Sequence, residues 1–151
     1  MSNTIRQLVE QRRIEEVAPN TEHAQFILKQ AAQHVRTAQA LAGTEDQAMA
    51  FTAAYDAARK ALTAVLAAHG LRVRPSGGAH RNTGIAAAEF VSHPSLAEFE
   101  WMRHVRNATE YPSEDRAPAT ALDVRDGIEA AEEIVSACRD HIHDVLASSS
   151  S

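Results

Sequence analysis

The densest group of side chains able to do chemistry lies in the second half of the chain. Arg103 and Arg106 are one helical turn apart, and two guanidiniums on one helix face offer forked donors that suit a phosphate. Asn107 and Tyr111 add neutral hydrogen-bonding groups. The same spacing also fits a simpler interpretation, in which Arg106 and Glu110 form an ion pair at a solvated helix end.

A second candidate is a basic stretch without carboxylates. No Asp or Glu occurs between Gly70 and Ala88, and the basic residues there are Arg72, Arg74, His80 and Arg81. The Gly77–Gly78 pair matches neither a P-loop nor a dinucleotide fingerprint. Loops of this kind nevertheless often carry binding residues.

The histidines and the single cysteine do not indicate a metal site. His141 and His143 are two positions apart on a predicted helix, so they point in different directions, and neither HExxH nor HxxxH occurs. Cys138 falls on a core position of that helix, where it is typical of a small buried hydrophobe. We therefore expect no metal and no cofactor.

Helices must position these residues, because apolar side chains recur every three or four positions along most of the chain. Four long helices are predicted: from an Asn20 N-cap to Gly43, from a Thr44–Gln47 capping box to Gly70, from a Ser95–Glu98 box to a stop before Pro112, and from a Thr120–Asp123 box onward. A short helix is expected over about 82–91, residues 71–79 are expected to be a loop, and no segment indicates a strand.

Length and pattern predict one all-α domain, a bundle of four long helices plus short helical pieces. The chain has 151 residues, enough for one core. We expect residues 1–19 to form an N-terminal arm or short helix, 20–147 the bundle, and 148–151 a disordered tail.

The net charge of −5 argues against general coating of nucleic acid but is compatible with a local basic cleft. No apolar run approaches the roughly 20 residues that span a bilayer. The first residues carry charges throughout, which is not typical of a signal peptide. The expected location is the cytoplasm, away from membranes.

Three motifs resemble the HEPN domain family, and in particular a branch common in actinobacteria. The most specific is Arg106-Asn107-Ala108-Thr109-Glu110-Tyr111-Pro112 at the end of a helix; the others are 54–61, which contains Asp56, and 77–80, which ends in His80. The resemblance covers about residues 20–147. It implies an antiparallel helical bundle and a homodimer with the Arg106 helix ends near the two-fold axis.

The resemblance also implies where a site would lie. In ribonuclease members an Arg, followed four to six residues later by a His, cleaves RNA without a metal. Arg106 matches that Arg, but Tyr111 stands where the His would be, and a tyrosine exchanges protons poorly near neutral pH. We expect Arg106 and Tyr111 to share a pocket with Asn107, close to His80 or Arg103, and Asp56 to be buried and to reach Arg106.

Three functions are compatible with these residues. The first is an accessory module that binds RNA, a nucleotide or a protein partner, such as a nucleotidyltransferase antitoxin, in a toxin–antitoxin or phage-defence setting. The second is a metal-independent endoribonuclease that uses Arg106. The third is a structural helical dimer without a ligand. Because Tyr111 replaces the usual His, the first interpretation is favoured.

Overall fold

The computed structural model describes residues 1–113 and 117–149. In chain order the elements are α1 (Asn3–Glu10), β1 (Ile14–Glu16), α2 (Thr21–Ala42), α3 (Gln47–Ala68), β2 (Leu71–Val73), α4 (Ala79–Ala87), the 3-10 helix η1 (Pro94–Ala97), α5 (Glu98–Glu110) and α6 (Ala121–Ser149). The prediction of an all-α helical bundle is confirmed.

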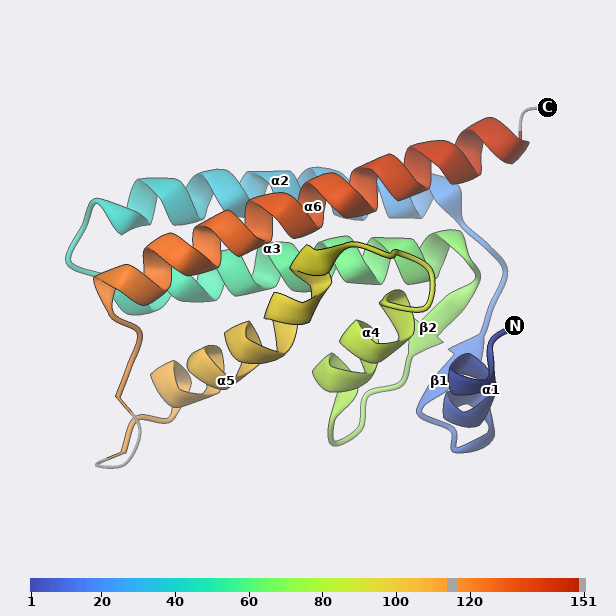
Figure 1. The fold of residues 1–151 in the computed structure, drawn as a ribbon, viewed down its shortest axis with the longest axis horizontal. Coiled ribbons are helices and arrows are strands. Elements are labelled where there is room, and N and C mark those ends of the chain that lie inside the picture. Colours follow the sequence, from blue (N-terminus) through green and yellow to red (C-terminus); the bar gives the residue numbers. More distant parts are fainter. Residues whose placement is uncertain (114–116, 150–151) are drawn as a thin grey trace.

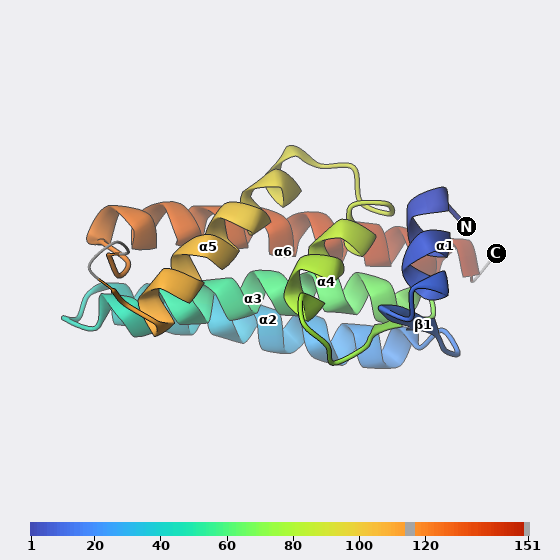
Figure 2. The same ribbon diagram turned by 90° about the horizontal axis from the view of Figure 1, so that it is seen from below.

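The helices form two layers. The long helices α2, α3 and α6 lie side by side, and α4 and α5 cross one face of this layer at an angle (Figures 1 and 2). The chain turns back between α2 and α3, so these two helices are antiparallel, and α6 runs in the direction of α3 (Figure 1). Helix α1 and the strands lie beside α4, at the end of the bundle where α3 terminates.

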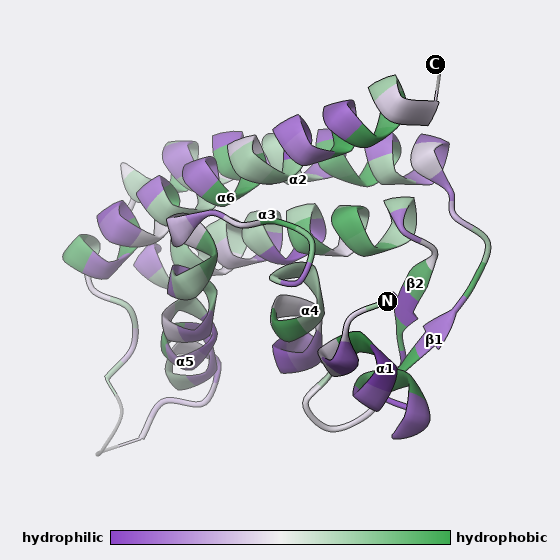
Figure 3. Ribbon diagram, turned by 45° about the vertical axis from the view of Figure 1, so that its right-hand side comes forward, coloured by the Kyte–Doolittle hydropathy of each residue, from purple (hydrophilic) through white to green (hydrophobic). Residues whose placement is uncertain are grey.

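Helix α3 is the centre of the core because most of its surface is made of small side chains. Twelve of its 22 residues are buried, and seven of those twelve are alanines. Alanine allows neighbouring helices to approach closely at no side-chain entropy cost. Around α3, the other helices carry apolar and polar residues in alternating bands, as expected of helices with one face in the core (Figure 3).

Two of the predicted helix starts are confirmed. The Asn20 side chain accepts a hydrogen bond from the backbone N–H of His23 at 2.9 Å and caps α2. Before α6, Thr120 and Asp123 each accept from the other's backbone N–H, at 3.0 and 3.1 Å, which is the reciprocal pattern of a capping box.

The other two predicted starts are wrong. The N-cap of α3 is Asp46, whose carboxylate accepts from the Met49 N–H at 3.1 Å, while the Gln47 side chain donates backwards to the carbonyls of Ala42 and Thr44. Ser95 lies inside η1, which His93 caps, and α5 begins only at Glu98. In both places a second polar residue within two positions of the predicted cap takes over the capping role.

The expectation that the chain has no strands is also wrong. β1 and β2 pair antiparallel, with Ile14 opposite Val73 and Glu16 opposite Leu71. Three residues are too few for a visible alternation of apolar and polar side chains, and the partner strands are far apart in sequence. The pairing joins the segment before α2 to residues 71–73, the first part of the expected 71–79 loop.

Two boundaries shift as well. Helix α4 occupies Ala79–Ala87, earlier than the expected 82–91. Helix α6 continues through Ser148 and Ser149, where a disordered tail was expected; residues 150–151 lie outside the described residues.

Candidate functional site

Two hollows meet at the start of α4, and we call them together the basic groove. The smaller, of about 270 Å³, is lined by the β2–α4 connection and by His80, Arg81, Arg103 and Asn107. The larger, of about 580 Å³, lies between α2, α3, β2 and the start of α4, and its cationic or titratable residues are His23, Arg59, Arg72, Arg74 and His80. Ala79 and His80 line both hollows, and none of the described residues that line either one is an Asp or Glu. The groove is therefore suited to an anion.

The turn before α4 places His80 at the junction of the hollows. Gly78, the N-cap of α4, has a φ of 84°, in the left-handed region that glycine enters without strain, and no atom lies within 4 Å of where a Cβ would be. No side chain caps this end of α4. The first turn of α4 therefore begins in the smaller hollow, where the positive end of its dipole favours negative charge.

Tyr55 of α3 holds the His80 ring through a hydrogen bond. The Tyr55 hydroxyl and the His80 Nδ1 are 2.9 Å apart, and the Tyr55 side chain is fully buried, stacked on Phe99 with 5.3 Å between ring centroids. Burial raises the pKa of Tyr55 to about 12, so its hydroxyl keeps its proton. Burial first, and then the charge of Arg59, lowers the pKa of His80, so this imidazole is mainly neutral at pH 7.

Guanidiniums surround the Tyr55–His80 pair. The Arg106 Cζ lies 5.7 Å from the centroid of the Tyr55 ring, and the charges of Arg59, Arg103 and Arg106 all act on His80. The Nε atoms of Arg59 and Arg106 are buried and have no hydrogen-bond partner among the described residues. Each of these two atoms is therefore a buried donor without an acceptor, which costs free energy.

The structure brings together only part of the predicted site. His80, Arg103 and Asn107 line the smaller hollow. Arg106 lies behind that hollow, against Tyr55, and forms the 2.9 Å ion pair with Glu110 that the simpler interpretation anticipated.

Tyr111 is set apart from these residues. It is the C-cap of α5, it is 71% exposed, and it is not among the residues that line the groove. A helix that ends before Pro112 leaves its last side chains at the surface, so a shared pocket for Arg106 and Tyr111 is not formed within the described residues.

The expected contact between Asp56 and Arg106 is also absent from the described part of the chain. The Asp56 side chain is 35% exposed, and its ion pair is with Arg59 on its own helix, at 3.8 Å. Arg106 already has a carboxylate one turn further along α5, so it does not require Asp56.

Two residues of the site were not singled out as such from the sequence. Tyr55 and Arg59 both lie in the 54–61 motif, but neither was given a role there. Their i,i+4 spacing places them on one face of α3, and that spacing is the sequence signal that links them.

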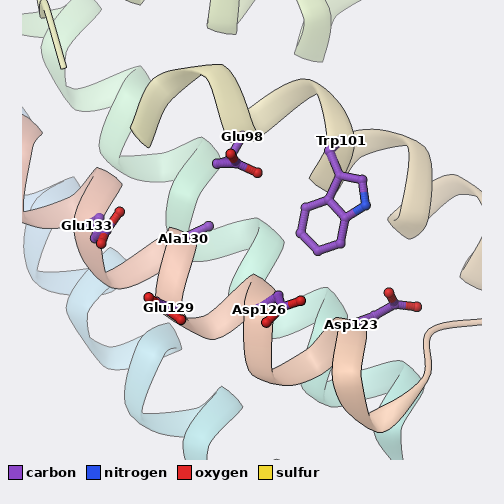
Figure 4. A pocket seen from close by; sticks show the side chains of 7 residues that line it. All are labelled: Glu98, Trp101, Asp123, Asp126, Glu129, Ala130 and Glu133. Carbon is purple, nitrogen blue, oxygen red and sulfur yellow. The ribbon is translucent and has the colours of Figure 1, made fainter. Parts of the chain in front are cut away.

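A third hollow, of about 450 Å³, has the opposite character. It lies between α5 and α6, and Figure 4 shows Glu98 and Trp101 on α5 opposite a row of carboxylates along α6, which are Asp123, Asp126, Glu129 and Glu133. This concentration of carboxylates explains how an acidic chain can contain a groove without any. A polyanion would be repelled here and attracted at the basic groove.

Among the described residues, no three His, Cys, Asp or Glu side chains are arranged to hold a metal ion. Cys138 is fully buried, as its core position predicted, and burial raises the pKa of its thiol to about 12, so it is not a reactive nucleophile. No helix of the described residues is both long and apolar enough to cross a membrane.

Fold and groove together define an all-α bundle with an anion-attracting surface around the start of α4. The HEPN domain family matches residues 24–141, and the chain belongs to this family. HEPN domains are commonly RNA-binding or nuclease modules. Comparisons with curated proteins and with solved structures found no match.

Proposed function

We propose that this chain binds RNA or a nucleotide through its basic groove, as an accessory HEPN module that does not cleave the ligand. One observation carries the proposal. Three arginines in the larger hollow and two in the smaller one meet around His80 with no carboxylate in either lining, in a chain of net charge −5.

The arginines of the groove differ in how free they are to bind. Among the described residues, Arg74 and Arg81 form no ion pair, and the Arg59–Asp56 contact is long at 3.8 Å. Arg72 is held by Glu15 at 2.7 Å, and Arg103 is held by both oxygens of Glu100. Arg74 in the larger hollow and Arg81 in the smaller one are therefore the best candidates for direct phosphate contacts.

Binding is favoured over cleavage because the motif supplies charge but no base. Cleavage of RNA without a metal needs a group that takes a proton from the 2′-hydroxyl near neutral pH. Tyr111 stands where ribonuclease members have a His, and its side chain points to solvent rather than into the groove. The second candidate function, a metal-independent endoribonuclease, is favoured only by the presence of the His80 ring among the guanidiniums.

Assembly is part of the proposal. HEPN domains often dimerise. We propose a homodimer in which the α5 ends that carry Arg106 approach the two-fold axis, with a cognate protein, such as a nucleotidyltransferase antitoxin, as a further partner. Such a dimer would place two basic grooves in one particle, which would strengthen binding to a ligand long enough to reach both.

The test is the affinity for a fluorescent single-stranded oligouridylate, measured by anisotropy in EDTA. Arg74→Ala and Arg81→Ala should each weaken binding several-fold. Each should also reduce the slope of log affinity against log salt concentration by about 0.7, the equivalent of one phosphate contact. Arg125→Ala is the matched control, because Arg125 is 75% exposed, lies on α6 outside the groove and carries the same charge. Equal effects of all three variants would contradict the proposal.

Cleavage is read in the same samples on a denaturing gel. Intact RNA with the unmodified chain is the expected result. RNA cut by the unmodified chain but not by Arg106→Ala would establish the ribonuclease instead. A gain of cleavage in Tyr111→His would show that only the base is missing from the motif.

A further inference from the structure

The hydrogen bond between Tyr55 and His80 has one favourable direction. Nδ1 of His80 is the single hydrogen-bond partner of the Tyr55 hydroxyl among the described residues. If Nδ1 carried the hydrogen and donated it, the buried hydroxyl would keep a hydrogen with no acceptor, which costs free energy. If the hydroxyl donates to Nδ1, both groups are satisfied. Nδ1 is then an acceptor, and the hydrogen of the neutral imidazole is on Nε2.

The position of His80 determines where that Nε2–H lies. The ring is held at Nδ1 by a fully buried tyrosine, and the two ring nitrogens point away from each other. His80 is only partly buried and lines both hollows of the basic groove. Nε2 has no hydrogen-bond partner among the described residues, and the ring that carries it lines the groove.

We propose that Tyr55 is a positioning residue that fixes His80 in the Nε2–H tautomer, so that His80 binds a phosphate oxygen as a neutral donor and not as a base. The inference rests on the proposed function and deepens it. In this tautomer Nε2 has no lone pair to take a proton from a 2′-hydroxyl, which gives a local reason for binding without cleavage.

The charged groups around His80 also favour its neutral form over the imidazolium. Arg59 from α3 and Arg103 and Arg106 from α5 disfavour the imidazolium, and among the described residues Asp56 from α3 is the one group that favours it. The guanidiniums supply the positive charge that a phosphate needs. The neutral imidazole adds a directed hydrogen bond.

The first measurement is the tautomer, read from ¹⁵N shifts of the His80 ring in the labelled protein at pH 7.5. The inference predicts a protonated Nε2 and an unprotonated Nδ1. It also predicts that Tyr55→Phe raises the pH midpoint of His80 by about half a unit to one unit, because the neutral ring loses one hydrogen bond. Tyr111→Phe, which removes an exposed hydroxyl, should leave that midpoint unchanged.

Tyr55→Phe keeps the ring that stacks on Phe99, so the variant should fold. Hydrogen on Nδ1 in the unmodified chain, or a midpoint that does not move in folded Tyr55→Phe, would overturn the inference.

The second measurement uses the oligouridylate and separates this inference from the proposed function. Bound RNA should shift His80 Nε2. His80→Gln, which keeps a neutral donor, should bind nearly as well as the unmodified chain, and His80→Leu should bind about threefold to tenfold more weakly, the equivalent of one neutral hydrogen bond. Normal RNA binding with an unmoved Nε2 and an unaffected His80→Leu variant would overturn the role of His80 while leaving the proposed function intact. If the unmodified chain does not bind the oligouridylate, the proposed function is refuted.

Discussion

A substitution at Gly84 tests whether the packing of α4 on α5 is what brings the groove together. A Cβ at Gly84 would lie 2.8 Å from Cδ2 of Phe99. The Phe99 ring is stacked on Tyr55, with 10° between the ring planes, so it cannot withdraw without disturbing the residue that holds His80. We predict that Gly84→Ala destabilises the fold and also weakens binding at the groove.

The magnitude follows from two opposing terms. Alanine in place of glycine inside a helix contributes about 1 kcal/mol of stability. Overpacking of a close-packed core costs about 1–3 kcal/mol, and a contact this short with a ring that has no room to move belongs in the upper half of that range. The net loss should be about 1–2 kcal/mol, measured by urea unfolding.

Gly43→Ala is the matched control, because its Cβ would meet its nearest neighbour at an ordinary 3.8 Å. That variant should be as stable as the unmodified chain or slightly more so. If Gly84→Ala were equally stable, the two helices would have slack at this contact, and the packing argument would be refuted.

Three further predictions concern charge and assembly. Asp56→Ala should cost less than about 1 kcal/mol, because its pair with Arg59 is long and partly exposed, and RNA binding should not weaken; a loss of several kcal/mol would show a buried role instead. Burial lowers the pKa of both His69 and His141, whose Nε2 atoms are 2.8 Å apart, so the unfolded chain takes up more protons below pH 6.5 and stability should fall between pH 7 and pH 5. In His141→Gln part of that pH dependence of urea unfolding should disappear, and an unchanged slope would contradict the assignment. Light scattering should give twice the monomer mass of 16.4 kDa, and the monomer mass would reject the homodimer.

The long helices could be predicted from the sequence because their apolar periodicity extends over many turns. The buried face of α3, for example, includes Phe51, Tyr55, Ala58, Leu62 and Val65 at helical spacing. The strands could not be predicted, because each has three residues and owes its existence to a partner distant in sequence. The helix starts were ambiguous wherever two capping residues lay within two positions of each other, as at Thr44 and Asp46.

Only part of the candidate site could be predicted from the sequence, because the rest depends on how distant helices pack together. The motif on α5 and the basic stretch at 70–88 were both visible as local patterns, and the structure brings them together through Arg103, Asn107 and His80. That Tyr55 supports His80, and that Tyr111 faces solvent, depends on how α3, α4 and α5 pack. A linear motif says which side chains share a helix but not which neighbouring helix they meet.

The central claim is that the basic groove, and not another face, binds the phosphate-bearing ligand. Its most direct test is a titration of the ¹⁵N-labelled chain with the oligouridylate, followed through the backbone amide shifts. The account predicts that the largest changes fall on residues 72–81 and 103–107, with amides 123–133 beside the acidic hollow unmoved. Changes concentrated at 123–133, or spread evenly over the surface, would contradict it.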